Sequence, residues 1–234
     1  MKKARLVFSI VLVTIFIEMI FNLDTSTKQC INYECHTYKI PLYLKILDFF
    51  GRHYHYKLLV KDIINSQDSD EVRAMKIFVW VYNNLKRIPD GFPVTDDHVW
   101  HTIIRGYGID DQFQDAFTTL CNYASLDAFF DYVYGKNKED KKSLSFVRMN
   151  KTWTVLDAYN GVYFKNGQGR MASIEDIISG DWRVANLKMG SIAGTYYTQY
   201  FKNLASVNWK QYKLSRPTLQ SPLNRLIFLL KKKK

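Results

Sequence analysis

The chain has 234 residues, of which 33 are Lys or Arg and 22 are Asp or Glu, giving a formal net charge of +11. Its 47% hydrophobic and 15% aromatic content exceeds that of disordered chains, and 11 Gly with 5 Pro exclude collagen-like sequence. Three cysteines are too few for a disulfide-dense scaffold, so the length predicts one sizeable domain, alone or with appendages.

Most of the positive charge lies at the two ends of the chain. Residues 1–23 and 231–234 together hold seven basic residues and one acidic residue, which leaves 26 basic and 21 acidic residues in the body. The body's lysines are scattered among acids, without an arginine-rich patch, a zinc knuckle or an aromatic RNA-binding motif. We therefore expect no nucleic-acid partner.

The N-terminus has the pattern of a membrane segment. Residues 1–5 form a basic end, and residues 6–23 are apolar apart from Ser9, Thr14, Glu18 and Asn22. As a helix this stretch is about 27 Å long, enough for a bilayer core, and the preceding lysines favour a cytoplasmic N-terminus. We expect an uncleaved signal anchor in a single-pass membrane protein with its domain outside the cytoplasm. A cleaved signal peptide, giving a secreted or periplasmic protein, and a buried core helix are the alternatives.

The next segment, residues 24–65, is predicted to be a helical extension, with two short helices within Lys39–Asn65. Cys30 and Cys35 lie at its start, five residues apart, and they could pair in an oxidising compartment, although spacing alone does not establish a disulfide. Cys121 lies in a helical apolar pattern and is predicted to be a core residue.

Residues 66–182 are predicted to form the core of the domain, and the first part of this range has clear helical periodicity. One helix is predicted from a polar cap at Ser66–Asp70 to Leu85, and it stops before Pro89. The segment Asp90–Asp97 is predicted to be a loop. A second amphipathic helix is predicted from Asp111 to about Ser125.

The hydrophobic period then changes to that of strands. Strands are predicted at Leu126–Tyr134, Leu144–Met149 and Thr152–Ala158, with tight turns at Asn150-Lys151 and Asn160-Gly161 and an extended Val162–Phe164. Short helices are predicted at Ser173–Ser179 and Thr195–Leu204. A helix followed in the chain by strands that pair antiparallel indicates an α+β fold.

The C-terminal extension, residues 183–234, ends in the apolar run Leu226–Leu230 and a four-lysine tail. We expect a solvated tail. Contact with an anionic membrane surface is the alternative.

The run Arg105-Gly-Tyr-Gly-Ile-Asp-Asp-Gln-Phe resembles the transglutaminase-like superfamily, whose members often read R-G-Y-G-x-C-D-Q here. Downstream, Lys151-Thr-Trp-Thr-Val-Leu-Asp resembles that family's "dGkW…lD" strand, and the likeness covers about residues 70–180. It implies a papain-like core, with a central helix packed on an antiparallel sheet. Asp96-Asp-His-Val-Trp-His is similar to bacterial members encoded with surface-polysaccharide genes, which implies an envelope polysaccharide or a protein as partner.

The family's chemistry uses a Cys thiolate at a helix N-terminus, a His base on the next strand and an Asp that orients the His. In this chain the Cys position falls on Asp110, the His position on Ser143 and the orienting position on Asp157. All five histidines precede Asp110, so the resemblance implies a degenerate triad. We expect a non-catalytic protein of the cell envelope, and no cofactor.

Other constellations give further candidates. Asp96, Asp97, His98 and His101 could hold a divalent metal, although a polar loop is the simpler interpretation. Asp110 and Asp157 could act as paired carboxylates in a hydrolase or transferase, which is the alternative function. If the resemblance holds, the residues predicted to line the cleft are Trp100, Tyr107, Asp111, Gln112, Trp153 and Tyr159.

Overall fold

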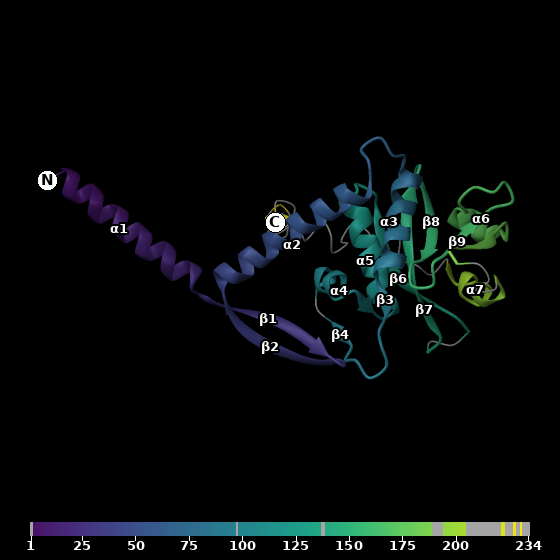
Figure 1. The fold of residues 1–234 in the computed structure, drawn as a ribbon, viewed down its shortest axis with the longest axis horizontal. Coiled ribbons are helices and arrows are strands. Elements are labelled where there is room, and N and C mark those ends of the chain that lie inside the picture. Colours follow the sequence, from purple (N-terminus) through teal and green to yellow (C-terminus); the bar gives the residue numbers. More distant parts are fainter. Residues whose placement is uncertain are drawn as a thin grey trace.

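The N-terminal helix α1 (Lys2–Phe21) projects from the rest of the chain in the computed structural model (Figure 1). The structure describes residues 2–204 except 97, 137, 138 and 189–193, together with 221, 222, 227 and 230. No residue of α1 is buried. The helix is long and apolar enough to cross a membrane, a property that a signal sequence shares.

A β-hairpin follows α1, where the sequence predicted a helical extension. β1 (Asp24–Ile31) pairs antiparallel with β2 (Glu34–Pro41), and the two turn residues between them both have positive φ. The disulfide Cys30–Cys35 joins directly opposed residues of the hairpin. β4 (Thr95–Asp96), in the predicted loop, pairs with the other edge of β1. The helical prediction was wrong for residues 24–41, which form strands. This stretch is mostly polar and lacks the alternating apolar residues that would have indicated a strand.

A single long helix, α2 (Leu42–Ile63), replaces the two short helices predicted in this region. It continues through Gly51 because Tyr56 and Val60, farther along, are buried in the core. The Leu42 N–H donates to the Leu23 carbonyl at 2.9 Å, so α2 begins beside the end of α1.

The next helix, α3 (Asp70–Asn84), confirms the sequence prediction. The Ser69 hydroxyl accepts a hydrogen bond from the Val72 N–H, and two acids occupy the first turn. Two short strands, β3 (Lys86–Arg87) and β5 (Tyr107–Gly108), then pair in parallel. They flank α4 (Val99–Arg105), and the pairing brings the end of α3 next to the start of α5 (Asp110–Tyr123).

Five antiparallel strands form the main sheet, in the order β10-β9-β8-β7-β6. The three predicted strands are confirmed, and Asn150 and Lys151 form the predicted tight turn with φ of 51° and 71°. The strand bounds are β6 (Ala128–Tyr134), β7 (Lys141–Met149), β8 (Thr152–Asp157), β9 (Val162–Lys165) and β10 (Arg183–Asn186).

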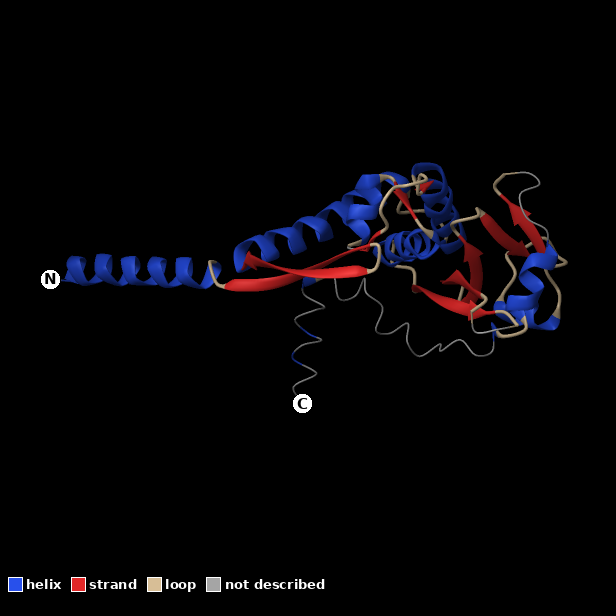
Figure 2. Ribbon diagram, turned by 90° about the horizontal axis from the view of Figure 1, so that it is seen from below, coloured by secondary structure: helices blue, strands red, loops and turns tan. Residues whose placement is uncertain are grey.

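Helices cover both faces of this sheet (Figures 1 and 2). On one face α3 and α5 bury Phe78, Phe117 and Leu120 against β7 and β8. On the other face α6 (Ile174–Ser179) and α7 (Gly194–Phe201) enclose a second cluster around Phe146 and Phe164. The predicted α+β class is confirmed. The lysine tail lies outside the described residues, and Ile227 and Leu230 are the described members of the last apolar run.

Candidate functional site

The site begins at the N-terminus of α5, where Asp110 is the first helical residue. The Ile109 N–H donates to Gln112 Oε1 at 3.2 Å, which closes the first turn. Negative charge at this position is favoured by the helix dipole, so a carboxylate fits here electrostatically as a thiolate would. The side chain of Asp110 is 33% exposed.

A buried lysine joins this helix to the sheet. Lys142, on β7, places its Nζ 2.9 Å from Asp110 Oδ2 and 3.2 Å from Asp157 Oδ2. Its side chain is only 6% exposed, and that of Asp157 is completely buried. One ammonium therefore connects the two aspartates that the resemblance aligned with the nucleophile and the orienting acid.

Asp157 is held by donors from several elements. Gln114 Nε2 donates to Oδ1 at 3.0 Å, and the Tyr197 hydroxyl donates to Oδ2 at 2.8 Å. The Asn160 N–H and Nδ2 reach Oδ1 and Oδ2 at 3.2 and 2.7 Å. A carboxylate surrounded in this way is a structural anchor, because its lone pairs are already occupied.

Gln114 links α5 to two strands at the same point. Its Oε1 accepts from the Ser145 hydroxyl at 2.6 Å and from the Ala158 N–H at 3.1 Å, while its Nε2 also lies 3.3 Å from Asp110 Oδ1. Every polar atom of this fully buried amide is satisfied. The helix is thus fixed against β7 and the end of β8.

Electrostatics keep the lysine protonated. Burial raises the pKa of Asp110, and the nearby Lys142 only partly counteracts this. Burial by itself would lower the pKa of Lys142, but the carboxylates of Asp157 and Asp110 outweigh it and raise that pKa above its ordinary value. Burial, and then the charge of Asp157, raise the pKa of Tyr197, so its phenol remains a donor.

Ser143, aligned with the family's His, lies beside Lys142 on β7. Its hydroxyl is buried and has no hydrogen-bond partner among the described residues. The hydroxyl that contacts the helix belongs instead to Ser145. Sequence reasoning missed Lys142, Gln114 and Tyr197; the only available signal was that two aligned acids would need a counter-ion.

Three predicted cleft residues lie close to this cluster. The Tyr159 ring centroid is 5.6 Å from Lys142 Nζ and 4.5 Å from the Arg87 guanidinium carbon. Asp111 accepts a hydrogen bond from the Tyr132 hydroxyl at 2.9 Å. Gln112 Nε2 donates to the carbonyl of Thr95 at 2.7 Å, so its amide attaches β4 to α5.

The other three predicted cleft residues have different neighbours. Trp100 stacks on His55 of α2 with ring centroids 5.1 Å apart, and Tyr107 packs edge-on against Phe92. Trp153 packs against Phe129, in the cluster on the face of the sheet that α6 and α7 cover. Their use in ligand binding stays a prediction.

The cysteine and histidine candidates lie in different environments from the Asp110–Lys142–Asp157 cluster. Cys121 is completely buried in the core of α5, and burial raises the pKa of its thiol well above the ordinary value. Within the described ranges, no cluster of three or more His, Cys, Asp and Glu side chains could hold a metal ion. Asp97 lies outside those ranges, while His98 and His101 have ring centroids 5.7 Å apart.

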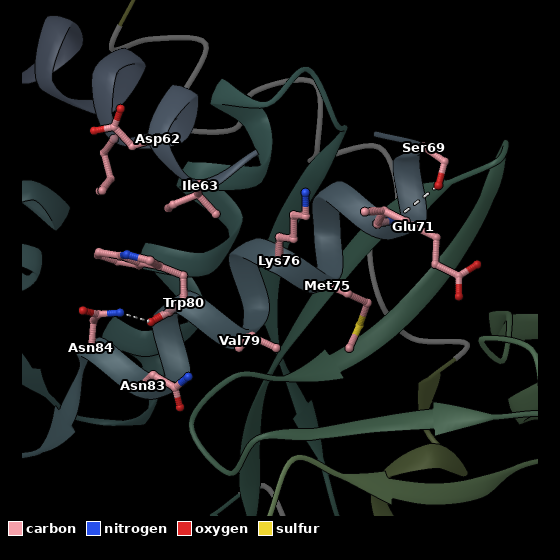
Figure 3. A pocket seen from close by; sticks show the side chains of 12 residues that line it. Asp62, Ile63, Ser69, Glu71, Met75, Lys76, Val79, Trp80, Asn83 and Asn84 are labelled. Carbon is pink, nitrogen blue, oxygen red and sulfur yellow. Dashed lines mark hydrogen bonds between the residues drawn. The ribbon is translucent and has the colours of Figure 1, made fainter. Parts of the chain in front are cut away.

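Two large hollows lie along α3. The first, of about 800 Å³, runs between α2 and α3. It is lined by apolar side chains such as Ile63, Val79 and Trp80 and by polar side chains that include Lys76 and Glu71 (Figure 3). The second, of about 850 Å³, lies at the end of α3 and includes Tyr159 and Asn160. It is therefore the hollow that adjoins the buried cluster.

No family model matches the chain, and no curated protein matches it. It is similar to the solved structure of a candidate cysteine protease from Cytophaga hutchinsonii, at 17% identity and a TM-score of 0.39, covering 61% of this chain and 51% of that one. It is also similar to a candidate protease from Parabacteroides distasonis, at 11% identity and a TM-score of 0.36, covering 57% and 35%. The match spans about half of the first structure and a third of the second.

Proposed function

We propose that the chain is a membrane-anchored, exported domain of transglutaminase-like, papain-like fold that binds a ligand or partner and does not transfer acyl groups. The observation that carries this proposal is the Lys142 bridge between Asp110 and Asp157, at 2.9 and 3.2 Å. A position that would hold a nucleophile is occupied by a carboxylate in an ion pair. The site supports binding better than covalent chemistry.

Two of the three parts of the acyl-transfer triad, the nucleophile and the base, lack their usual group. Asp110 is a weak nucleophile compared with a thiolate, and the hydroxyl of Ser143 cannot serve as a general base at neutral pH. Lys142 does not replace the base, because its raised pKa keeps it protonated. Cys121 is buried in the core and stays a thiol.

The paired-carboxylate alternative is less well supported by the geometry. A carboxylate that acts on substrate must reach it within hydrogen-bond distance. Asp157 has no exposed surface and accepts hydrogen bonds from Gln114, Asn160 and Tyr197 in addition to its ion pair. Only Asp110 retains access to solvent.

Two features support export and anchoring. α1 has the length and composition of a spanning segment, and the Cys30–Cys35 disulfide follows it directly. Such bonds persist in oxidising compartments outside the cytoplasm. A role in cell-surface polysaccharide assembly is the part of the proposal that depends on the resemblance at residues 96–101 alone.

The test of this proposal is an acyl-transfer and hydrolysis assay on the purified full chain, using a glutamine-containing peptide and a fluorogenic ester. We expect no rate above that of buffer, for the wild type and for Asp110→Ala alike. A wild-type rate that Asp110→Ala abolishes would show an active enzyme and overturn the proposal.

A further inference from the structure

The hollow at the end of α3 has an unusual charge composition. Three cations line it, Lys86 and Arg87 from β3 and Lys188 from the segment after β10, and no Asp or Glu does. Within the described residues none of the three lies in an ion pair with a carboxylate. Three like charges around one hollow repel each other, and a bound anion would relieve that repulsion.

Arg87 is held in place by contacts that do not neutralise its positive charge. Its Nη2 donates to Asn160 Oδ1 at 2.9 Å, and its guanidinium carbon lies 4.5 Å from the Tyr159 ring centroid. An amide and an aromatic ring therefore fix the side chain while its positive charge is kept. A guanidinium has five N–H donors, and the described partners use one of them, so a two-pronged contact with an anion remains available.

The buried cluster sets the orientation of that arginine. Asn160 donates hydrogen bonds to Asp157 from both its backbone N–H and its Nδ2, and its Oδ1 accepts the hydrogen bond from Arg87. Asp157 is in turn held by Lys142. Asp157, the residue that the resemblance aligns with the orienting Asp, thus supports the wall of the adjacent hollow through Asn160.

The remaining lining determines what kind of anion fits. Tyr82, Phe113 and Tyr159 supply aromatic surface, and Asn83 and Asn160 supply amides. Phe113 packs edge-on against Tyr159 with ring centroids 5.0 Å apart, which holds the ring in place. Aromatic rings can contact the apolar face of a sugar ring, amides can bond its hydroxyls, and cations can bind an acidic substituent.

We propose that this hollow binds a sugar bearing a carboxylate or phosphate group. The inference names the ligand class of the non-catalytic function proposed above and rests on that function. A volume of about 850 Å³ accommodates one to a few sugar rings.

The experiment is titration calorimetry on the full chain in detergent, with trigalacturonate, glucose 6-phosphate, neutral maltotriose and inorganic phosphate as probes. We expect one or both acidic sugars to bind, more weakly as salt rises, and maltotriose to show no binding. Binding of one acidic sugar and not the other identifies the acidic group. Phosphate alone should bind at least about 10-fold more weakly than the acidic sugar, since it makes no contact with the rings.

Variants test the residues themselves. Arg87→Gln should weaken binding of the acidic sugar at least about 10-fold, and so should the exposed pair Lys86→Gln with Lys188→Gln, which does not touch the buried cluster. Arg148→Gln is the matched control, because this arginine lies on β7 and does not line the hollow. Thermal unfolding of each variant checks that it is folded.

Several outcomes would overturn the inference. These are no binding of either acidic sugar at millimolar concentration, equal binding of maltotriose, or equal loss in Arg148→Gln. None of them bears on acyl transfer. An acyl-transfer rate that depends on Asp110 would instead remove the proposed function, whatever the sugar titrations gave.

Discussion

Lys142 shows how one side chain determines the chemistry that a site can support. It occupies the space between α5 and β8, and its ammonium contacts both Asp110 and Asp157. Taking a lysine and an aspartate out of water is costly, and the cost is offset only while both charges keep their partners. The cluster is therefore sensitive to the loss of any one member.

Lys142→Met tests this sensitivity. The substitution keeps the length of the side chain but leaves Asp157 buried without its cation, so we expect a loss of about 3–5 kcal/mol in the free energy of unfolding. Lys141→Met, at the exposed neighbouring position where the ammonium lies 4.4 Å from the Tyr132 ring centroid, should cost less than about 1 kcal/mol. Urea denaturation measures both. Equal losses in the two variants would contradict the bridge.

At the scale of elements, local chemistry accounts for the starts of α3 and α6 and for the turn before β9. α6, predicted as a short helix, begins with a capping box: the Asp176 N–H donates to Ser173 Oγ at 3.1 Å, and the Ser173 N–H donates to Asp176 Oδ2 at 2.9 Å. The turn before β9 depends on Gly161, with φ of 65°. Such features involve neighbours in sequence, which is why a single sequence reveals them.

The capping box predicts a pH dependence. The hydrogen bond from the Ser173 N–H holds the pKa of Asp176 below its ordinary value. Stability from such an acid is fully present above its unfolded-state pKa of about 4 and is lost as the pH falls through the lower folded-state pKa. The difference in unfolding free energy between wild type and Asp176→Asn should be constant from about pH 5 to 7 and shrink below about pH 3. Urea titrations across this range measure it, and a difference that grows on acidification would refute the assignment.

Gly161→Ala tests the turn. A Cβ at this position would lie 2.6 Å from Tyr82 Cε2, in addition to the strain of a positive φ. We expect a loss of about 2–4 kcal/mol. Gly91→Ala is the control, since its φ is 79° and no atom lies within 4 Å of the added Cβ, and strain alone should cost about 1 kcal/mol. A Gly161→Ala loss no larger than the control would show that the contact with Tyr82 relaxes.

At the scale of the whole molecule, one end is apolar helix and the other is the folded domain. α1 has no buried residue, whereas both faces of the main sheet are covered (Figure 2). The hairpin with its disulfide and the long α2 connect the two parts. An exposed apolar helix of 20 residues is stable in lipid and poorly soluble in water.

Leu12→Arg tests the anchor. An arginine at the centre of a spanning helix costs about 2.5–3.5 kcal/mol of insertion free energy, so less of the chain should remain in the membrane fraction after an alkaline wash. Asn22→Arg, just beyond the last residue of α1, should leave that fraction unchanged. Retention of both variants to the same extent would argue against a spanning α1.

The sequence by itself determined the α+β class, the apolar N-terminal segment, α3, α5, the capped α6, the tight turn at Asn150 and the three strands after α5. These features depend on helix caps, turn residues and hydrophobic periodicity, each of which involves residues that are close together in the chain. It did not determine the β1–β2 hairpin, whose polar strands lack a period, or the continuity of α2 through Gly51. The tertiary structure alone decided how the basic residues of the domain are used: Lys142 pairs with the buried Asp157 and with Asp110, while Lys86, Arg87 and Lys188 share one hollow. Lys142 and Lys188 lie far from Lys86 and Arg87 in the chain, and the energy of a charge depends on which other charges and how much water lie near it in space.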